Sequence, residues 1–212
     1  MSNLGTIIGL PIGLLGFLFL FWRRLKEDYP AGHILSFGFL IIIPLLIGFL
    51  AGLVISGVIF SPNPVFFSPT GLWFWLAFGL SLIGFGVGQV KFRLRTYETF
   101  EAMALGFLFW FFALSFSNSL VTGNLKLFFF SLVVGSLVSF FFFLDVRYKT
   151  FTWYKSGKIG FSGLAILVML FFIRVFVALL DPSMLSFIGK FDAILSGIVS
   201  FIFLIIIYNL SG

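Results

Sequence analysis

Arg174 is the one charged residue well inside an apolar stretch of this 212-residue sequence. It stands six residues before Leu180, so in a helix rising about 1.5 Å per residue it lies about 9 Å below that end. A charge at such a depth is costly in a membrane and usually marks function or a specific partner. A guanidinium there can hold a lipid phosphate or stabilise a developing anionic leaving group. The alternative is that Arg174 reaches outward to water or pairs with Asp181, on the same helix face.

Asn118 lies toward the same end of its own apolar stretch. Its side-chain amide can orient a polar headgroup, and the alternative is an Asn that terminates a helix. The carboxylates of Glu98 and Glu101, three residues apart, suggest acid–base chemistry, but they also suit a helix N-terminus and pairing with Arg93 or Arg95. We therefore take Arg174 and Asn118 as the candidate catalytic and substrate-binding residues.

The composition requires that most of the chain lie in apolar surroundings. Hydrophobic residues make up 61% of it, charged residues only 9%, and the mean hydropathy is +1.21. A soluble domain of this length carries roughly 25% charged residues. With no Cys and one His (His33, read as a residue at headgroup level), the chain offers no disulfide and too few ligands for a His-built metal site, and we expect no cofactor. No Asp, Glu or His stands at mid-depth, which argues against an ion pump.

A membrane span needs about 20 largely apolar residues, and seven stretches meet or approach that length. We expect an all-α, polytopic bundle of seven transmembrane helices forming one integral membrane domain over residues 1–212. The first stretch has no basic residue before it, so we expect a retained helix, and Pro44 predicts a kink or tilt in the second. The stretches are Leu4–Trp22, Ile34–Phe60, Gly71–Val90, Met103–Leu120, Leu127–Leu144, Ile159–Leu180 and Ala193–Leu210.

Basic residues between these stretches alternate in number. Ten fall in alternate loops, whereas Lys126 and Lys190 are the only two in the others. Cytoplasmic loops retain Lys and Arg, so we predict the N-terminus outside and the C-terminus inside. The net charge of +6 is thus a topology signal, and nucleic acid is not an expected partner. The ten residues are Arg23, Arg24, Lys26, Lys91, Arg93, Arg95, Arg147, Lys149, Lys155 and Lys158.

Glycines recur four residues apart in the first three stretches. Such spacing gives a flat helix face on which a neighbouring backbone can approach closely. We expect the first three spans to form a close-packed group. The run Gly84-Phe85-Gly86-Val87-Gly88 is similar in sequence to a nucleotide-binding loop, but it lies within a span and no strand precedes it. We therefore do not expect it to bind a nucleotide. The spaced glycines are Gly5, Gly9 and Gly13, then Gly48 and Gly52, then Gly84 and Gly88.

The order of these features resembles the bacterial prolipoprotein diacylglyceryl transferase family over nearly the whole chain. The matching segments combine basic, glycine-rich and aromatic–acidic motifs with the Arg of the sixth span. They are Trp22-Arg23-Arg24-Leu25-Lys26, Gly48 with Ala51-Gly52-Leu53-Val54, Gly71-Leu72-Trp73-Phe74-Trp75, Tyr97-Glu98-Thr99-Phe100-Glu101, Ser115-Phe116-Ser117-Asn118, Gly157, Gly160 and Gly163 before Phe172-Ile173-Arg174, and Ala193-Ile194-Leu195-Ser196.

The resemblance implies a multi-pass protein of the bacterial plasma membrane that moves diacylglyceryl from phosphatidylglycerol to the lipobox cysteine of a preprolipoprotein. It implies functional positions at Arg174 and Asn118, with Gly71 in a substrate-binding segment. Two family positions differ, because Trp75 stands where the family has a His and Ser115 stands at its signature Arg. The expected partners are an anionic phospholipid headgroup and the signal peptide of the substrate protein, and the oligomeric state stays open.

Three hypotheses follow for the function. The first is an active, diverged diacylglyceryl transferase in which Arg174 holds phosphate and Asn118 orients the glycerol. The second is a relative that has lost the reaction and binds phospholipid or a partner protein, which the missing Arg and His favour. The third is a small transporter, which the scarcity of polar residues at mid-depth disfavours.

Overall fold

The computed structural model describes residues 2–58, 68–151, 154 and 159–211, and these form an all-helical bundle. Within them, seven helices are long and apolar enough to cross a membrane, which makes the chain a multi-pass membrane protein. The seven are α1 (Asn3–Leu25), α2 (Ala31–Val58), α3 (Leu72–Phe92), α4 (Thr96–Thr122), α5 (Leu125–Arg147), α6 (Phe161–Leu180) and α7 (Phe191–Ser211). Two short 3₁₀ turns, η1 (Pro69–Gly71) and η2 (Tyr148–Thr150), precede α3 and follow α5.

The seven predicted spans are confirmed, each by one helix, although most of the helices are longer. The largest difference is at α4, which begins at Thr96 instead of Met103. Its first turns hold Glu98 and Glu101, whose side chains are paired with arginines and so are tolerated in the helix. Pro44 lies within the single helix α2. The end of the predicted second span (residues 59–60) and Lys155, Gly157 and Lys158 lie outside the described residues.

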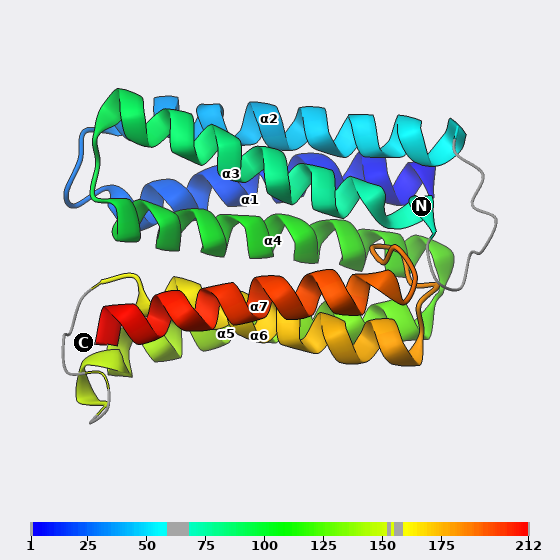
Figure 1. The fold of residues 1–212 in the computed structure, drawn as a ribbon. Coiled ribbons are helices and arrows are strands. Elements are labelled where there is room, and N and C mark those ends of the chain that lie inside the picture. The colour runs from blue at the N-terminus through cyan, green and yellow to red at the C-terminus, as the bar shows by residue number, and fades with distance from the viewer. Residues whose placement is uncertain (1, 59–67, 152–153, 155–158, 212) are drawn as a thin grey trace.

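Successive helices run in opposite directions, so the two termini lie at opposite ends of the bundle (Figure 1). We call the end at which α1 begins, with Thr122, Leu125 and Leu180, the N-terminal end. The opposite end, where α1, α3, α5 and α7 finish, is the basic end. Eight of the ten basic residues of the alternate loops lie in the described residues at the basic end, and Lys126 and Lys190 belong to the N-terminal end. The side of the membrane that each end faces stays a prediction.

The helices associate as close pairs, α2 with α3, α1 with α4, and α6 with α7. The prediction that the first three spans form one close group is wrong for α1, because its glycines face α4. A Cβ at Gly9 would lie 2.9 Å from the Ala113 carbonyl oxygen, whereas one at Gly48 would collide with the backbone of Leu76 in α3. Glycine spacing marks a face that permits close approach but does not specify which helix covers it.

Helix α4 is the most buried of the seven, and its end determines the geometry at the N-terminal end of the bundle. It stops at Gly123, whose φ of 64° belongs to the left-handed region that a glycine adopts freely. Asn124 follows at once as the N-cap of α5, where its side chain accepts a hydrogen bond from the Leu127 amide. The tight connection holds the end of α4 beside the start of α5.

Candidate functional site

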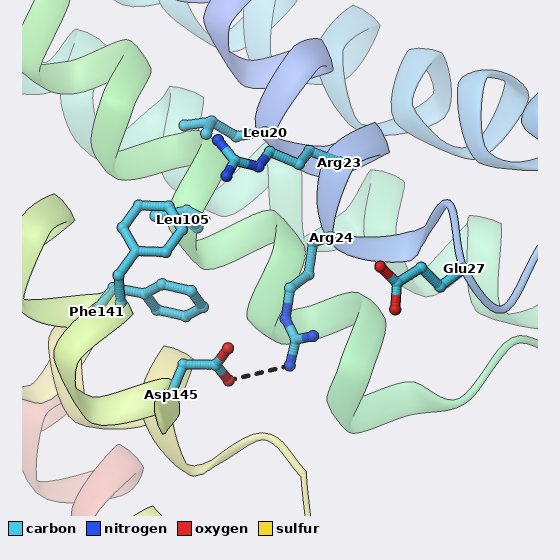
Figure 2. A pocket seen from close by; sticks show the side chains of 8 residues that line it. Leu20, Arg23, Arg24, Glu27, Leu105, Phe141 and Asp145 are labelled. Carbon is cyan, nitrogen blue, oxygen red and sulfur yellow. Dashed lines mark hydrogen bonds and ion pairs between the residues drawn. The ribbon is translucent and has the colours of Figure 1, made fainter. Parts of the chain in front are cut away.

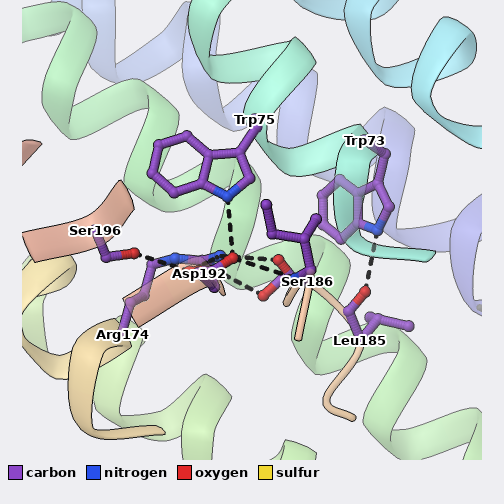
Figure 3. Close-up of polar contacts among 8 residues, drawn as sticks. Trp73, Trp75, Arg174, Leu185, Ser186, Asp192 and Ser196 are labelled. Carbon is purple, nitrogen blue, oxygen red and sulfur yellow. Dashed lines mark hydrogen bonds and ion pairs between the residues drawn. The ribbon is translucent and has the colours of Figure 1, made fainter. Parts of the chain in front are cut away.

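Arg174 lies fully buried in α6, where its guanidinium is bound by the start of α7 and the preceding loop (Figure 3). Nη2 donates to both carboxylate oxygens of Asp192, at 3.0 and 2.8 Å. The two terminal nitrogens also donate to Ser186, Nη1 to its hydroxyl at 2.9 Å and Nη2 to its carbonyl at 2.8 Å. Of the guanidinium nitrogens, only Nε has no hydrogen-bond partner among the described residues. The charge is therefore neutralised within the protein.

Asp192 accepts three further hydrogen bonds, from α3, from the loop before α7 and from α7 itself. It accepts from the Trp75 indole at 2.9 Å, the Ser196 hydroxyl at 2.8 Å and the Ile188 amide at 3.3 Å. Aromatic rings complete the enclosure, because the Arg174 guanidinium carbon lies 3.7 Å from the ring centre of Phe74 and 4.3 Å from that of Phe187. The side chains of both Arg174 and Asp192 are 0% exposed.

The expected alternatives for Arg174, pairing with Asp181 or reaching outward to water, are both wrong. Asp181 follows the last residue of α6 with a non-helical φ of −141°, and its carboxylate accepts instead from Lys126 of α5 at 2.7 Å. Equal spacing on a helix face places two residues together only while the helix continues. Asp192 is the ion-pair partner of Arg174 in place of Asp181, because residues 181–190 fold back and bring the start of α7 against Arg174.

Gly71 holds this returning loop in place by its lack of a side chain. A Cβ at Gly71 would collide with the backbone of Phe187, and the Ser68 amide beside it donates to the Ile188 carbonyl at 3.2 Å. The Trp73 indole adds a bond to the Leu185 carbonyl at 3.1 Å (Figure 3). Gly71 thus packs against the loop that binds Arg174, and its predicted role in substrate binding stays a prediction.

Asn118 lines a different place, a polar cavity of about 230 Å³ at the N-terminal end. Its side-chain oxygen accepts from the Ser2 amide at 3.0 Å and the Ser2 hydroxyl at 3.2 Å, and its Nδ2 donates to the Leu114 carbonyl at 3.0 Å. The helix-terminator alternative is wrong, because α4 continues to Thr122. The cavity is lined by Ser2, Asn118, Thr122, Asn124, Lys126, Leu127, Asp181, Ser183, Met184 and Leu185.

The ion pair of Lys126 and Asp181 supplies the two charges of this polar cavity. Hydrogen bonds from the Lys126 ammonium and from the Ser183 hydroxyl (2.6 Å) hold the pKa of Asp181 below its usual value. The Lys126 side chain is 77% exposed, and an ammonium has three N–H donors, so donors remain beside the bond to Asp181. The cavity can therefore bind a ligand that combines an anion with hydroxyl groups.

The structure does not bring Arg174 and Asn118 into one site. Leu185 lines the polar cavity, but the next residue, Ser186, is buried against Arg174, which is not among the lining residues. The loop of residues 181–190 thus contributes to both places without joining them.

The carboxylates at the basic end pair with arginines. Glu98 lies 3.8 Å from Arg95, as one of the expected pairings has it, but Glu101 pairs with Arg24 of α1 at 2.9 Å. His33 is exposed beside the ring of Phe92. Among the described residues, no group of three or more His, Cys, Asp or Glu side chains is arranged to hold a metal ion.

Sequence reasoning missed Asp192, Ser186 and Lys126. Asp192 did carry a signal, since it is the acidic residue directly before the seventh predicted span and a partner of opposite charge for Arg174. Ser186 carried none, because a loop serine does not show that its chain folds back into a bundle. For Lys126 the sequence indicates topology alone.

Comparison with known proteins gives no match to any family model, curated protein or solved structure. The resemblance to the diacylglyceryl transferases stays a prediction.

Proposed function

We propose that the protein binds the headgroup of an anionic phospholipid of the phosphatidylglycerol type, and that it does so in the polar cavity at the N-terminal end. One observation carries the proposal. A cavity of about 230 Å³, lined by hydroxyl and amide groups and by the cation of Lys126, lies between the ends of membrane-spanning helices.

The chemistry of the cavity matches the two halves of such a headgroup. The remaining donors of Lys126 suit a phosphate oxygen, for which a lysine acts as a point charge. The hydroxyls of Thr122 and Ser183 donate within the protein, so their oxygens can accept from the glycerol hydroxyls. The side-chain N–H groups of Asn124, whose oxygen caps α5, can donate to them. Met184 and Leu185 offer an apolar edge to the start of the acyl chains.

The depth of the cavity also supports a lipid. Its residues include Thr122, the last residue of α4, Lys126 in the first turn of α5, and Asp181, directly after α6. The ends of helices that cross about 30 Å of hydrocarbon lie at headgroup level. With the basic end in the cytoplasm, the cavity belongs to the outer leaflet, and the family that the chain resembles leads us to propose the bacterial plasma membrane.

Several features favour binding without the transfer reaction. Arg174 is enclosed and neutralised by Asp192, and Trp75, at the family's His position, donates its indole N–H to the same carboxylate. Asp181 is the one carboxylate that lines the cavity. Its lowered pKa makes it a weak base for a thiol, whose ordinary pKa is about 8.5.

Diacylglyceryl transfer is the second candidate function. The seven-helix arrangement favours it, since the resemblance implies seven spans and the structure has seven helices able to span a membrane. In this reaction the lipobox thiolate of the signal peptide would displace glycerol phosphate, and the absence of Cys from this chain does not oppose it.

Two measurements test these functions on the purified full-length protein. Native mass spectrometry with phosphatidylglycerol and phosphatidylcholine should show a preference for the former that Lys126→Gln weakens about tenfold, the value of one charge-assisted hydrogen bond. Lys190→Gln, which removes the other exposed lysine of the N-terminal end, should leave binding unchanged. Equal binding by the Lys126→Gln variant would refute the proposed site.

A transfer assay then separates the two functions. Phosphatidylglycerol labelled in its acyl chains is incubated with a lipobox peptide, with a known active transferase as control. We expect no label on the peptide cysteine, and label that depends on this protein would establish the second candidate instead.

A further inference from the structure

A second cavity, of about 180 Å³, lies at the basic end between α1, α4 and α5 (Figure 2). Charged and apolar side chains divide its wall, with the charged ones toward the helix ends. Its lining consists of Leu20, Arg23, Arg24, Glu27, Leu105, Phe141, Phe142 and Asp145.

Two of the four charged groups are held by the protein. Nη2 of Arg24 donates to Glu101 at 2.9 Å and to Asp145 at 3.2 Å, which ties α1 to α4 and α5. The other nitrogens of Arg24 are not used in this way, since Nη1 has no hydrogen bond to a described residue and Nε is buried without a partner. One oxygen of Asp145 is likewise unused in this network. The guanidinium is fixed in position, and its Nη1 retains donors for a ligand.

The other two charged groups, Arg23 and Glu27, are exposed and form no ion pair with any described residue. Arg23 lies over the ring of Phe142, with 5.9 Å from its guanidinium carbon to the ring centre. Figure 2 shows Arg23 and Glu27 on different sides of Arg24. The cavity thus presents a cation and an anion that have no counter-ion among the described residues.

The apolar part of the wall lies deeper in the bundle. Leu20 precedes Arg24 by one helical turn, about 6 Å toward the membrane interior. Phe142 and Phe143 expose 41% and 46% of their surface on α5, so the cavity adjoins apolar surface suited to acyl chains. A small soluble ion would use the charged half of this wall only.

We propose that this cavity binds the headgroup of a phospholipid that carries both a phosphate and a primary amine, as phosphatidylethanolamine does. The phosphate lies between Arg23 and Nη1 of Arg24, and the ammonium group donates to Glu27. Arg23 and Glu27, which form no ion pair with a described residue, give the cavity an available cation and an available anion, and these match the two charges of a zwitterion. This site is at the opposite end of the bundle from the proposed phosphatidylglycerol site and does not depend on it.

Lipid titrations of the full-length protein test the assignment. Native mass spectrometry should show phosphatidylethanolamine binding about tenfold more tightly than phosphatidylcholine, whose methylated amine has no N–H to donate to Glu27. Glu27→Gln should abolish that preference, and Arg23→Gln should weaken phosphatidylethanolamine about tenfold. Since both residues are exposed and form no ion pair with a described residue, the variants should fold, which circular dichroism checks.

Matched controls are Asp28→Asn and Lys26→Gln, which remove the same charges from neighbouring exposed residues outside the cavity lining. Both should keep the preference, as should Lys126→Gln at the N-terminal end, so that failure of one lipid site is distinguishable from failure of the other. A preference for phosphatidylethanolamine that survives Glu27→Gln, or tighter binding of phosphatidylglycerol that Arg23→Gln removes, would overturn the assignment.

Discussion

At the scale of single residues, Arg174 and Asp192 form an ion pair inside the bundle, where neither side chain is exposed. Asp192→Asn removes the negative charge and leaves a buried guanidinium uncompensated. Loss of one partner from a buried pair costs about 3–5 kcal/mol, so we expect a marked fall in unfolding temperature. Thermal unfolding in detergent, followed by circular dichroism, measures the fall. Asp181→Asn breaks a pair whose lysine is 77% exposed and should cost less than about 1 kcal/mol. Equal losses would contradict the inferred importance of the buried pair.

The Lys126–Asp181 pair should give a small pH dependence of stability. The pKa of Asp181 is lowered in the folded protein by the hydrogen bonds from Lys126 and Ser183. Its stabilisation is thus fully present above its unfolded pKa, about 3.9, and is lost as the pH falls through the lower folded pKa. The unfolding temperatures of the wild type and Asp181→Asn should differ slightly at pH 6, and the difference should close progressively as the pH falls below about 4. A difference in unfolding temperature that grows as the pH falls would contradict a lowered pKa of Asp181 in the folded protein.

At the scale of elements, glycines set the distance between paired helices. A Cβ at Gly48 in α2 would collide with the Leu76 backbone in α3, whereas one at Gly79 in α3 would meet no atom within 4 Å. We expect Gly48→Ala to destabilise the protein by about 1–3 kcal/mol through forced separation of the helices. Gly79→Ala should be neutral or stabilising by up to about 1 kcal/mol, because alanine favours the helix. Thermal unfolding of the two variants compares them directly, and a stabilised Gly48→Ala variant would contradict this packing.

The sequence predicts the helices of this bundle better than their contacts. About 20 apolar residues suffice to identify a span, so all seven appeared in their places. The helix that packs against Gly9 could not be predicted, since a stripe of small residues fits the backbone of any neighbouring helix. The partner of Arg174 was misassigned for a related reason. Spacing along α6 favours Asp181, but the loop that follows turns back and brings Asp192 to Arg174. The position of Asp192 before the seventh span marks it as a possible partner, but the fold of the loop, which decides between the two, is not visible in a local pattern.

At the scale of the whole molecule, the distribution of basic residues predicts orientation, and the absence of Cys makes that prediction measurable. Lys26 at the basic end and Lys190 at the N-terminal end are both exposed, so Lys26→Cys and Lys190→Cys each introduce one accessible thiol into a chain without any. With the basic end in the cytoplasm, a membrane-impermeant maleimide should label Lys190→Cys in intact spheroplasts, and Lys26→Cys only after lysis. Removal of Lys26 leaves nine basic residues in the alternate loops and removal of Lys190 leaves all ten, so the bias is kept in both variants. Labelling in the reverse order would invert the bundle, and it would also move the proposed phosphatidylglycerol site to the inner leaflet and the proposed phosphatidylethanolamine site to the outer one.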